Sequence, residues 1–189
     1  GRTLTMAAAT GQPAYQEQWQ PLAPGFVNVP YDDIDAIKGA TNSETCAVML
    51  EPVQGEGGVN IPSTDYLKQV REWCDEQNLV MILDEVITGF RWSPGGAQAR
   101  LGIDPDLCTL AKILTGGLPG GAVAGKSKVM AVMEQSGDSH HDRFERVQHG
   151  GTFDANPYAA ATGNAALKIV ATGAMQKQAD RMADRLRRG

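Results

Sequence analysis

Three short apolar runs, CAVML (46–50), LVMIL (79–83) and LCTLA (107–111), are typical of β-strands buried on both faces of a parallel sheet that helices cover. Each run leads directly into a charged side chain, and these side chains are Glu51, Asp84 and Lys112. Ligands of open α/β sheets bind at the carboxyl ends of the strands. The runs therefore predict an α/β fold with a mainly parallel sheet, in which Asp84 and Lys112 share one crevice.

The stretch between the first two runs has the period of an amphipathic helix. We expect Ser63 as its N-cap and Asn78 as its end, and apolar residues recur along one face at Tyr66, Leu67, Val70, Trp73 and Cys74. Strand, helix and strand in close succession predict a right-handed βαβ unit. We also expect strands at 26–30 and 122–125, and helices at 32–40, 97–101, 127–135, 157–172 and 174–188.

The composition argues against several classes of protein. The net charge is −5 and the charges are interspersed, so no clustered Lys and Arg surface for nucleic acid is predicted. No run approaches the roughly 18 apolar residues of a membrane span, and the opening residues lack the apolar core of a signal peptide. Cys46, Cys74 and Cys108 lie in apolar surroundings and are expected to be reduced core residues, which favours a cytoplasmic location.

One motif indicates a different function. Gly120, Gly125, Lys126 and Ser127 fit the P-loop pattern GxxxxGK[ST], and LVMILDE (79–85) imitates a Walker B strand. A P-loop needs a glycine loop between a strand and a helix, whereas AVAG within this match is apolar and strand-like. The two motifs also occur in the reverse of the usual order. An ATPase is therefore the weaker hypothesis.

A second alternative is a metal site. His140, His141, Asp142 and His149 are residue types that bind zinc. Their spacing matches no standard zinc pattern, and adjacent histidines in a polar loop are more typical of a solvated surface. We therefore predict no metal here.

The Asp84 and Lys112 pair could be a plain ion pair at a sheet edge. The glycine-rich turns around it admit close backbone approach by a ligand and favour a binding site instead; they are GFR (89–91), TGG (115–117) and PGG (119–121). Pyridoxal phosphate (PLP) requires a lysine that forms a Schiff base and a carboxylate that keeps the pyridine nitrogen protonated. The pair thus predicts PLP as the cofactor.

The chain resembles the class III (ω-amino) aminotransferases, PLP enzymes of fold type I, in four motifs that occur in the family's order. They are LEPVQGEGG (50–58), LDEVITGFR (83–91), LAKILTGGLPGGAVAGK (110–126) and HGGTFDANPYAAATG (149–163). The resemblance covers nearly the whole chain. It implies a homodimer that moves an amino group from an amino donor to a keto acid. It also implies that residues 1–173 are part of the large cofactor-binding domain, and that 174–189 begin the helix leading to a small C-terminal domain.

The resemblance assigns roles to single residues. It makes Lys112 the Schiff-base lysine and Asp84 the partner of the pyridine nitrogen, and it packs Val86 on one face of the cofactor ring. Gly151 and Thr152 belong to the loop that binds the cofactor phosphate. The resemblance implies that Thr152 reaches the phosphate of the neighbouring subunit across a dimer interface.

The subfamily signals are mixed. Glu56, in GEGG, corresponds to a glutamate that in ornithine-type enzymes helps manage the arginine of the substrate carboxylate. Those enzymes usually have Gln after DEV, where this chain has Ile87, and the run 87–122 instead resembles glutamate-1-semialdehyde 2,1-aminomutase. A transaminase acting on an ω-amino donor is the main hypothesis. The aminomutase and a non-catalytic fragment are the alternatives.

Overall fold

The computed structural model describes residues 3–189. Its strands are β1 (Ala47–Leu50), β2 (Val80–Asp84), β3 (Leu107–Leu110) and β4 (Ala122–Gly125). Its α-helices are α1 (Leu4–Ala9), α2 (Pro13–Gln16), α3 (Ile34–Ala40), α4 (Tyr66–Gln77), α5 (Gly96–Leu101), α6 (Ser127–Met130), α7 (Pro157–Val170) and α8 (Ala174–Arg188). Shorter helical turns are η1 (Glu17–Trp19), η2 (Lys112–Thr115), η3 (Ala131–Met133) and the π-helical η4 (His141–Glu145).

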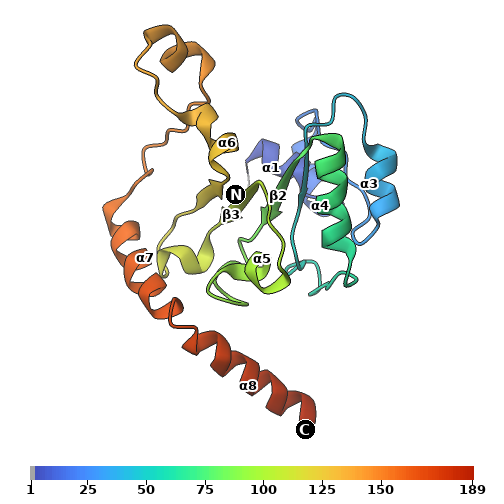
Figure 1. Cartoon of the computed structure of the whole chain (residues 1–189), viewed down its shortest axis with the longest axis vertical. Helices are drawn as coiled ribbons and strands as arrows, with labels where there is room; N and C mark the ends of the chain where they lie inside the picture. The colour runs from blue at the N-terminus through green and yellow to red at the C-terminus, as the bar shows by residue number, and fades with distance from the viewer. Residues whose placement is uncertain (1–2) are drawn as a thin grey trace.

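The sheet has the order β1-β2-β3-β4 (Figure 1). The first three strands are parallel, and β4 runs antiparallel beside β3. Because α4 connects β1 to its parallel neighbour β2, the predicted succession of strand, helix and parallel strand is confirmed. The carboxyl ends of three parallel strands consequently meet at one edge of the sheet.

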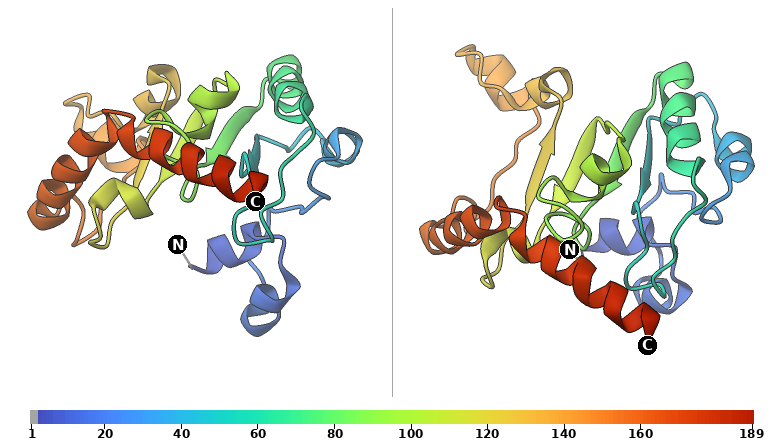
Figure 2. Two further views of the ribbon diagram at one scale, coloured as in Figure 1. Left: turned by 90° about the horizontal axis from the view of Figure 1, so that it is seen from below. Right: turned by 60° about the horizontal axis from the view of Figure 1, so that its bottom comes forward.

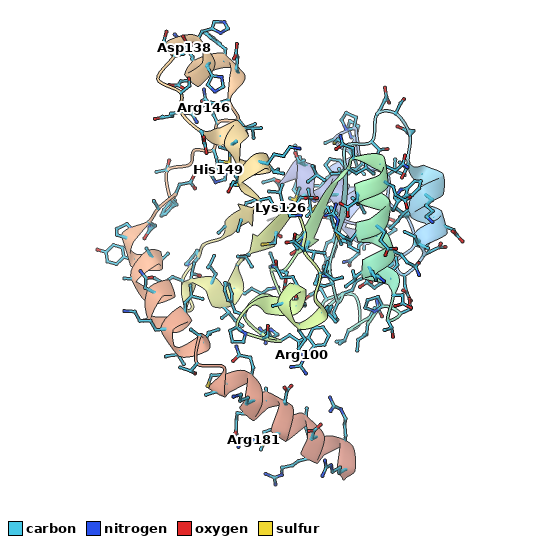
Figure 3. The ribbon with its side chains drawn as sticks, in the orientation of Figure 1. Arg100, Lys126, Asp138, Arg146, His149 and Arg181 are labelled. Carbon is cyan, nitrogen blue, oxygen red and sulfur yellow. The ribbon has the colours of Figure 1, made fainter. Side chains whose placement is uncertain are left out.

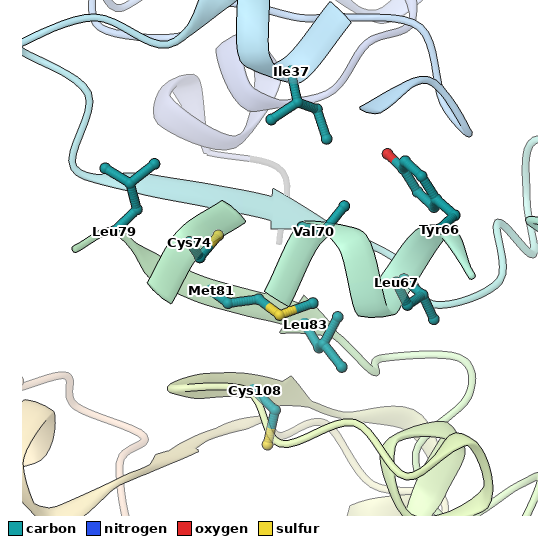
Figure 4. Close-up of a cluster of buried hydrophobic side chains, with 9 residues drawn as sticks. All are labelled: Ile37, Tyr66, Leu67, Val70, Cys74, Leu79, Met81, Leu83 and Cys108. Atoms are coloured by element: carbon teal, nitrogen blue, oxygen red, sulfur yellow. The ribbon is translucent and has the colours of Figure 1, made fainter. Parts of the chain in front are cut away.

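The hydrophobic core lies between α4 and one face of this sheet. Val70 and Cys74 of α4 are fully buried against Met81 and Leu83 of β2, and Ile37 of α3 joins the cluster (Figure 4). Each fully buried side chain of this size contributes about 1.5–3 kcal/mol through the hydrophobic effect. Burial also raises the pKa of the Cys74 thiol to about 11, so it is a protonated core residue as predicted.

The second face of the sheet is less covered than the apolar runs suggested. Val80, Ile82 and Asp84 alternate with the buried residues of β2 and are half-buried, while Met49 of β1 is exposed. The prediction of strands buried on both faces is therefore wrong for the described chain, because α4 packs on one face only. Cys46 likewise precedes the first residue of β1 and is exposed, which corrects its prediction as a core residue.

The predicted strand at 26–30 is absent. Asn28 in this segment donates to the carbonyl oxygen of Ala9 at 3.0 Å and accepts from Gln16 at 3.2 Å, so side-chain bonds hold it where a strand would use ladder bonds. Ser63 is not the N-cap of α4 either. Its amide and hydroxyl both donate to Asp32, at 2.9 and 2.8 Å, which ties the start of α4 to the loop before α3.

The helix α4 ends where the sequence predicted, at the left-handed Asn78. The two C-terminal helices are also confirmed, and Figures 1 and 2 show them running in succession from the β4 side of the sheet to the C-terminus. Gln176 at the start of α8 donates to the carbonyl oxygen of Phe90 at 2.7 Å, and Arg100 pairs with Asp180 at 3.2 Å. Within residues 3–189 no helix is both long and apolar enough to cross a membrane.

Candidate functional site

Three polar side chains form a row across the carboxyl edge of the sheet. Asp84, the last residue of β2, is in register with Thr109 of β3. Leu50 of β1 is in register with Leu83, so the next residue, Glu51, lies beside Asp84. Side chains in register on parallel strands point to the same face, and here it is the face opposite α4. The sheet thus brings Glu51, Asp84 and Thr109 together at one edge.

The Asp84 carboxylate is fixed through one oxygen. Its Oδ1 accepts hydrogen bonds from the amide of Val86 at 2.9 Å and from the hydroxyl of Thr109 at 3.2 Å. Its Oδ2 makes no hydrogen bond to any of residues 3–189. The side chain therefore holds one defined orientation and keeps one oxygen available for a donor on a ligand.

Lys112 follows β3 closely and begins the turn η2. Its φ of 48° lies in the left-handed region, which costs a non-glycine residue of order 1–3 kcal/mol. Its side chain is exposed, and its ammonium forms no salt bridge or hydrogen bond in the part of the chain that the structure describes. Backbone strain of this kind is concentrated at functional sites, because the surrounding contacts must enforce it.

Helix α7 supplies those contacts. The hydroxyl of Thr162 donates to the carbonyl oxygen of Thr115 at 2.6 Å, which joins α7 to the end of η2. A Cβ atom at Gly163 would lie 2.7 Å from a carbonyl oxygen of η2, and one at Gly116 would lie 2.6 Å from a carbonyl oxygen of α7. Only glycine allows the two backbones to approach so closely. The position of Lys112 is therefore set by a helix that begins more than forty residues later.

Glu85 is a residue of the site region that the sequence analysis did not single out. It is 1% exposed, and its carboxylate accepts hydrogen bonds from the Thr88 hydroxyl at 2.7 Å and from the amides of Ala97 and Gln98, both at 2.8 Å. These donors satisfy a buried charge that would otherwise be costly. Glu85 consequently anchors the loop after Asp84 to the first turn of α5. The sequence signal was a second acidic residue directly after a strand-ending aspartate.

The electrostatic surroundings link Glu51 to the other charged residues of the edge. Burial raises the pKa of the Glu51 carboxyl, whereas a hydrogen bond from the amide of Gly55, at 3.3 Å, lowers it. The negative charge of Asp84 raises this pKa further, the positive charge of Lys112 lowers it, and Glu56 raises it slightly. Glu51 therefore lies within electrostatic reach of both Asp84 and Lys112. Glu56 itself is exposed on the turn after β1.

A separate hollow of about 290 Å³ lies between the loop after β2 and the junction of α7 and α8. Trp92, Arg100 and Gln176 are among the residues that line it. Neither Asp84 nor Lys112 takes part in it. Within the described chain the candidate site is an open edge of the sheet.

Comparison with known proteins identifies the family. The model of the class III aminotransferases matches residues 1–189. The chain belongs to this family. An acetylornithine aminotransferase of Methanocaldococcus jannaschii is 44% identical over 171 residues, which are 90% of this chain and 40% of the relative. Ornithine aminotransferase 2 of Staphylococcus saprophyticus is 38% identical over 177 residues, which cover 90% of this chain and 41% of the relative.

A solved structure of ornithine aminotransferase from Toxoplasma gondii, in which PLP partially occupies the active site, matches with a TM-score of 0.85 at 33% identity. The match covers 99% of this chain and 42% of that one. The α/β fold with its mainly parallel sheet is thus that of the fold type I aminotransferases. The chain spans about two fifths of the length of these three relatives.

In this class III aminotransferase chain, Gly151 and Thr152 lie apart from the row of polar residues. They are exposed on the loop that precedes α7, where the carbonyl oxygen of Gly151 accepts from the amide of Asp154 at 3.0 Å. No hydrogen bond among residues 3–189 joins this loop to Asp84 or Lys112. Their predicted role toward a phosphate group stays a prediction.

The P-loop hypothesis is wrong. The supposed loop is the strand β4, and Gly125 is in register with Leu107, at the amino end of β3 and far from the carboxyl edge. Lys126, which is labelled in Figure 3, forms salt bridges to Asp104 at 3.0 Å and to Asp106 at 3.2 Å. Gly125 has a structural reason of its own, because a Cβ atom at this position would lie 2.5 Å from the carbonyl oxygen of Asp106.

All three histidines belong to the segment that follows α6 in the chain, and His149 is labelled in Figure 3. The Nδ1 atoms of His140 and His141 are 3.2 and 3.1 Å from the carboxylate of Glu145, whereas His149 is 3.7 Å from Asp154. His140 and His141 thus share the carboxylate of Glu145, whereas His149 faces a different one. Across residues 3–189 no three side chains of ligand type come together as a metal site.

Proposed function

We propose that the full-length protein is a PLP-dependent aminotransferase that moves an amino group from an ω-amino donor to a keto acid. The observation that carries this proposal is that Asp84 and Lys112 lie at the same edge of the sheet, where one carboxylate oxygen of Asp84 and the ammonium group of Lys112 have no partner among residues 3–189. The names of the relatives support it, since they are acetylornithine and ornithine aminotransferases.

The residues at this edge suit PLP. The free Oδ2 of Asp84 could accept a hydrogen bond from the protonated ring nitrogen, and the exposed amine of Lys112 could attach to the aldehyde carbon. Val86, half-buried beside Asp84, would pack on one face of the ring. PLP, when bound, supplies an aldehyde that takes up an amino group and a ring that withdraws electrons from the substrate carbon.

Lys112, Asp84 and Glu56 would then have distinct roles in the reaction. Lys112 would act as general base and acid, removing a proton from the amine-bearing carbon of the substrate and returning it to C4′ of the cofactor. Asp84 would face the ring nitrogen with its Oδ2, because two donors already hold its Oδ1 and so fix the orientation of the carboxylate. Glu56, on the exposed turn after β1, would help to manage the arginine that binds the substrate carboxylate.

We further propose a homodimer with shared active sites, in which residues 1–173 belong to the large domain and 174–189 begin the helix toward a small domain. Thr152 lies beside two glycines, and such backbone amides and a hydroxyl make a good phosphate-binding loop. Phe153 and Tyr158 near it are 81% and 77% exposed, and an interface would cover these large apolar side chains.

Mixing two inactive variants of the full-length protein tests the shared site. Lys112→Ala removes the amine, and Thr152→Glu places a negative charge where a phosphate would bind. If Thr152 serves the opposite pocket, a mixed dimer carries both lesions in one pocket and leaves the other intact. Random exchange of subunits should then restore about a quarter of the wild-type activity per site, measured after mixing equal amounts.

Two controls accompany this experiment. Each variant alone must stay inactive when it is subjected to the same exchange, and exchange itself is followed with a mass tag on one variant. Free exchange without any recovered activity would show that Thr152 acts in its own pocket. A fully active monomer in sedimentation would contradict the dimer as well.

The substrate is tested with a panel of amino donors. We expect turnover of acetylornithine, ornithine or 4-aminobutyrate with 2-oxoglutarate or pyruvate as acceptor. Because Ile87 stands where ornithine-type enzymes usually have Gln, the panel also includes glutamate 1-semialdehyde, supplied without any keto acid. Formation of 5-aminolevulinate in that arm would identify an aminomutase, and absence of turnover in every arm by a PLP-loaded protein would contradict the proposed class of reaction.

A further inference from the structure

Glu51 and Asp84 form a pair of neighbouring carboxylates across β1 and β2. The register that joins Leu50 to Leu83 puts the two acids side by side on one face, on strands about 4.8 Å apart. Both are half-buried, and neither forms a salt bridge within residues 3–189. Two neighbouring carboxylates repel each other when both are ionised, so the charge of one disfavours the charge of the other.

The hydrogen bonds around the pair are unequal. Asp84 receives two good donors on one oxygen, from Val86 at 2.9 Å and from Thr109 at 3.2 Å. Glu51 receives one longer bond, from the amide of Gly55 at 3.3 Å. Donors stabilise a carboxylate in its charged form, so these hydrogen bonds favour the negative charge on Asp84 over a negative charge on Glu51.

The remaining groups that face Glu51 come from three other segments. Glu56 on the turn after β1 adds a negative charge, and Lys112 after β3 adds a positive one. Tyr31 donates its hydroxyl to the backbone carbonyl oxygen of Glu51 at 3.1 Å, so it does not stabilise the side-chain charge. Burial is the largest influence and raises the pKa of Glu51, in agreement with the unequal hydrogen bonds.

We propose that Glu51 is a positioning residue, which holds the proton of the carboxylate pair and thereby leaves Asp84 ionised to hold the ring nitrogen of the cofactor. The inference rests on the proposed function for the last part of that statement. If Glu51 were ionised, its negative charge would disfavour the ionised form of Asp84 and favour a protonated Asp84. A neutral Asp84 could no longer favour a protonated ring.

Titration of the two carboxyl groups tests the proposal in the full-length protein without cofactor. The side-chain carboxyl carbons of Asp and Glu are labelled with ¹³C and followed by NMR as the pH is changed. The signals are assigned from their loss in Glu51→Gln and Asp84→Asn, which keep size and shape. The readout is the titration midpoint of each acid, and it does not depend on enzymatic activity.

The expected pattern is asymmetric. Asp84 ionises first, while Glu51 is still neutral, so Glu51→Gln should leave the midpoint of Asp84 unchanged. Glu51 ionises second, against the charge of Asp84, so Asp84→Asn should move the midpoint of Glu51 to lower pH. The opposite pattern would mean that Asp84 holds the proton, and unchanged midpoints in both variants would mean that the acids are not coupled. Either result overturns the proposal.

A third variant keeps the test independent of substitutions in the pair itself. Thr109→Val removes one donor to Asp84 and preserves the shape of the side chain, so it should raise the midpoint of Asp84. An unchanged midpoint would contradict the role of the unequal hydrogen bonds. PLP binding is measured separately by absorbance. A protein that titrates as expected but binds no PLP would refute the proposed function and leave the proton assignment standing.

Discussion

Replacing Lys112 by alanine in the full-length enzyme is expected to lower kcat by at least about 10³-fold, because the proton transfer at the substrate carbon loses its general base and acid. The exposed side chain makes few packing contacts, so the fold should remain. The measurement is the steady-state rate with the preferred amino donor. Borohydride reduction and peptide mapping of the wild-type enzyme should locate the covalently attached cofactor on Lys112.

Lys126→Ala is the matched control for this substitution. It also removes an ammonium group next to a glycine-rich segment, but Lys126 pairs with Asp104 and Asp106 at the opposite edge of the sheet. Its loss should leave kcat nearly unchanged, since both salt bridges are partly exposed and weak. Cofactor found on Lys126 or Lys128, or near-normal turnover in Lys112→Ala, would contradict the assignment.

Asp84→Asn is expected to retain bound PLP and to lower kcat by about 10²–10³-fold. The amide can still accept from Val86 and Thr109, so the loop geometry is preserved. A neutral side chain does not hold the ring nitrogen protonated, and the ring then withdraws electrons less strongly from the substrate carbon. The measurement combines the absorbance of bound cofactor with the rate of transamination.

Asp104→Asn is the corresponding control, because it neutralises an exposed carboxylate at the other edge of the sheet. Its kcat should equal that of the wild type. If Asp84→Asn turned over substrate at a near-normal rate with cofactor bound, the charge of Asp84 would not matter for the reaction. If Asp84→Asn failed to bind PLP, Asp84 would be needed for cofactor affinity, and the expectation of retained cofactor with a lowered kcat would be wrong.

The local periods of the sequence by themselves determined the secondary structure around the site. The apolar runs specified β1, β2 and β3, and the helical period from Tyr66 to Cys74 specified α4, because each pattern depends only on neighbouring residues. Asp84 and Lys112 could be assigned to one edge from the sequence as well, because parallel strands joined by helices have their carboxyl ends at the same edge of the sheet. The order of the four motifs was also sufficient to indicate the family.

Only the tertiary structure decided how these residues are held. The burial of Glu85 depends on the first turn of α5, and the left-handed Lys112 depends on Thr162 and Gly163 of α7, contacts between segments far apart in the chain. The same kind of contact overruled the predicted strand at 26–30, where side-chain bonds to α1 and its surroundings replace a ladder. The P-loop match likewise fits its pattern in sequence but not in space, because a motif of adjacent letters carries no information about which edge of the sheet it occupies.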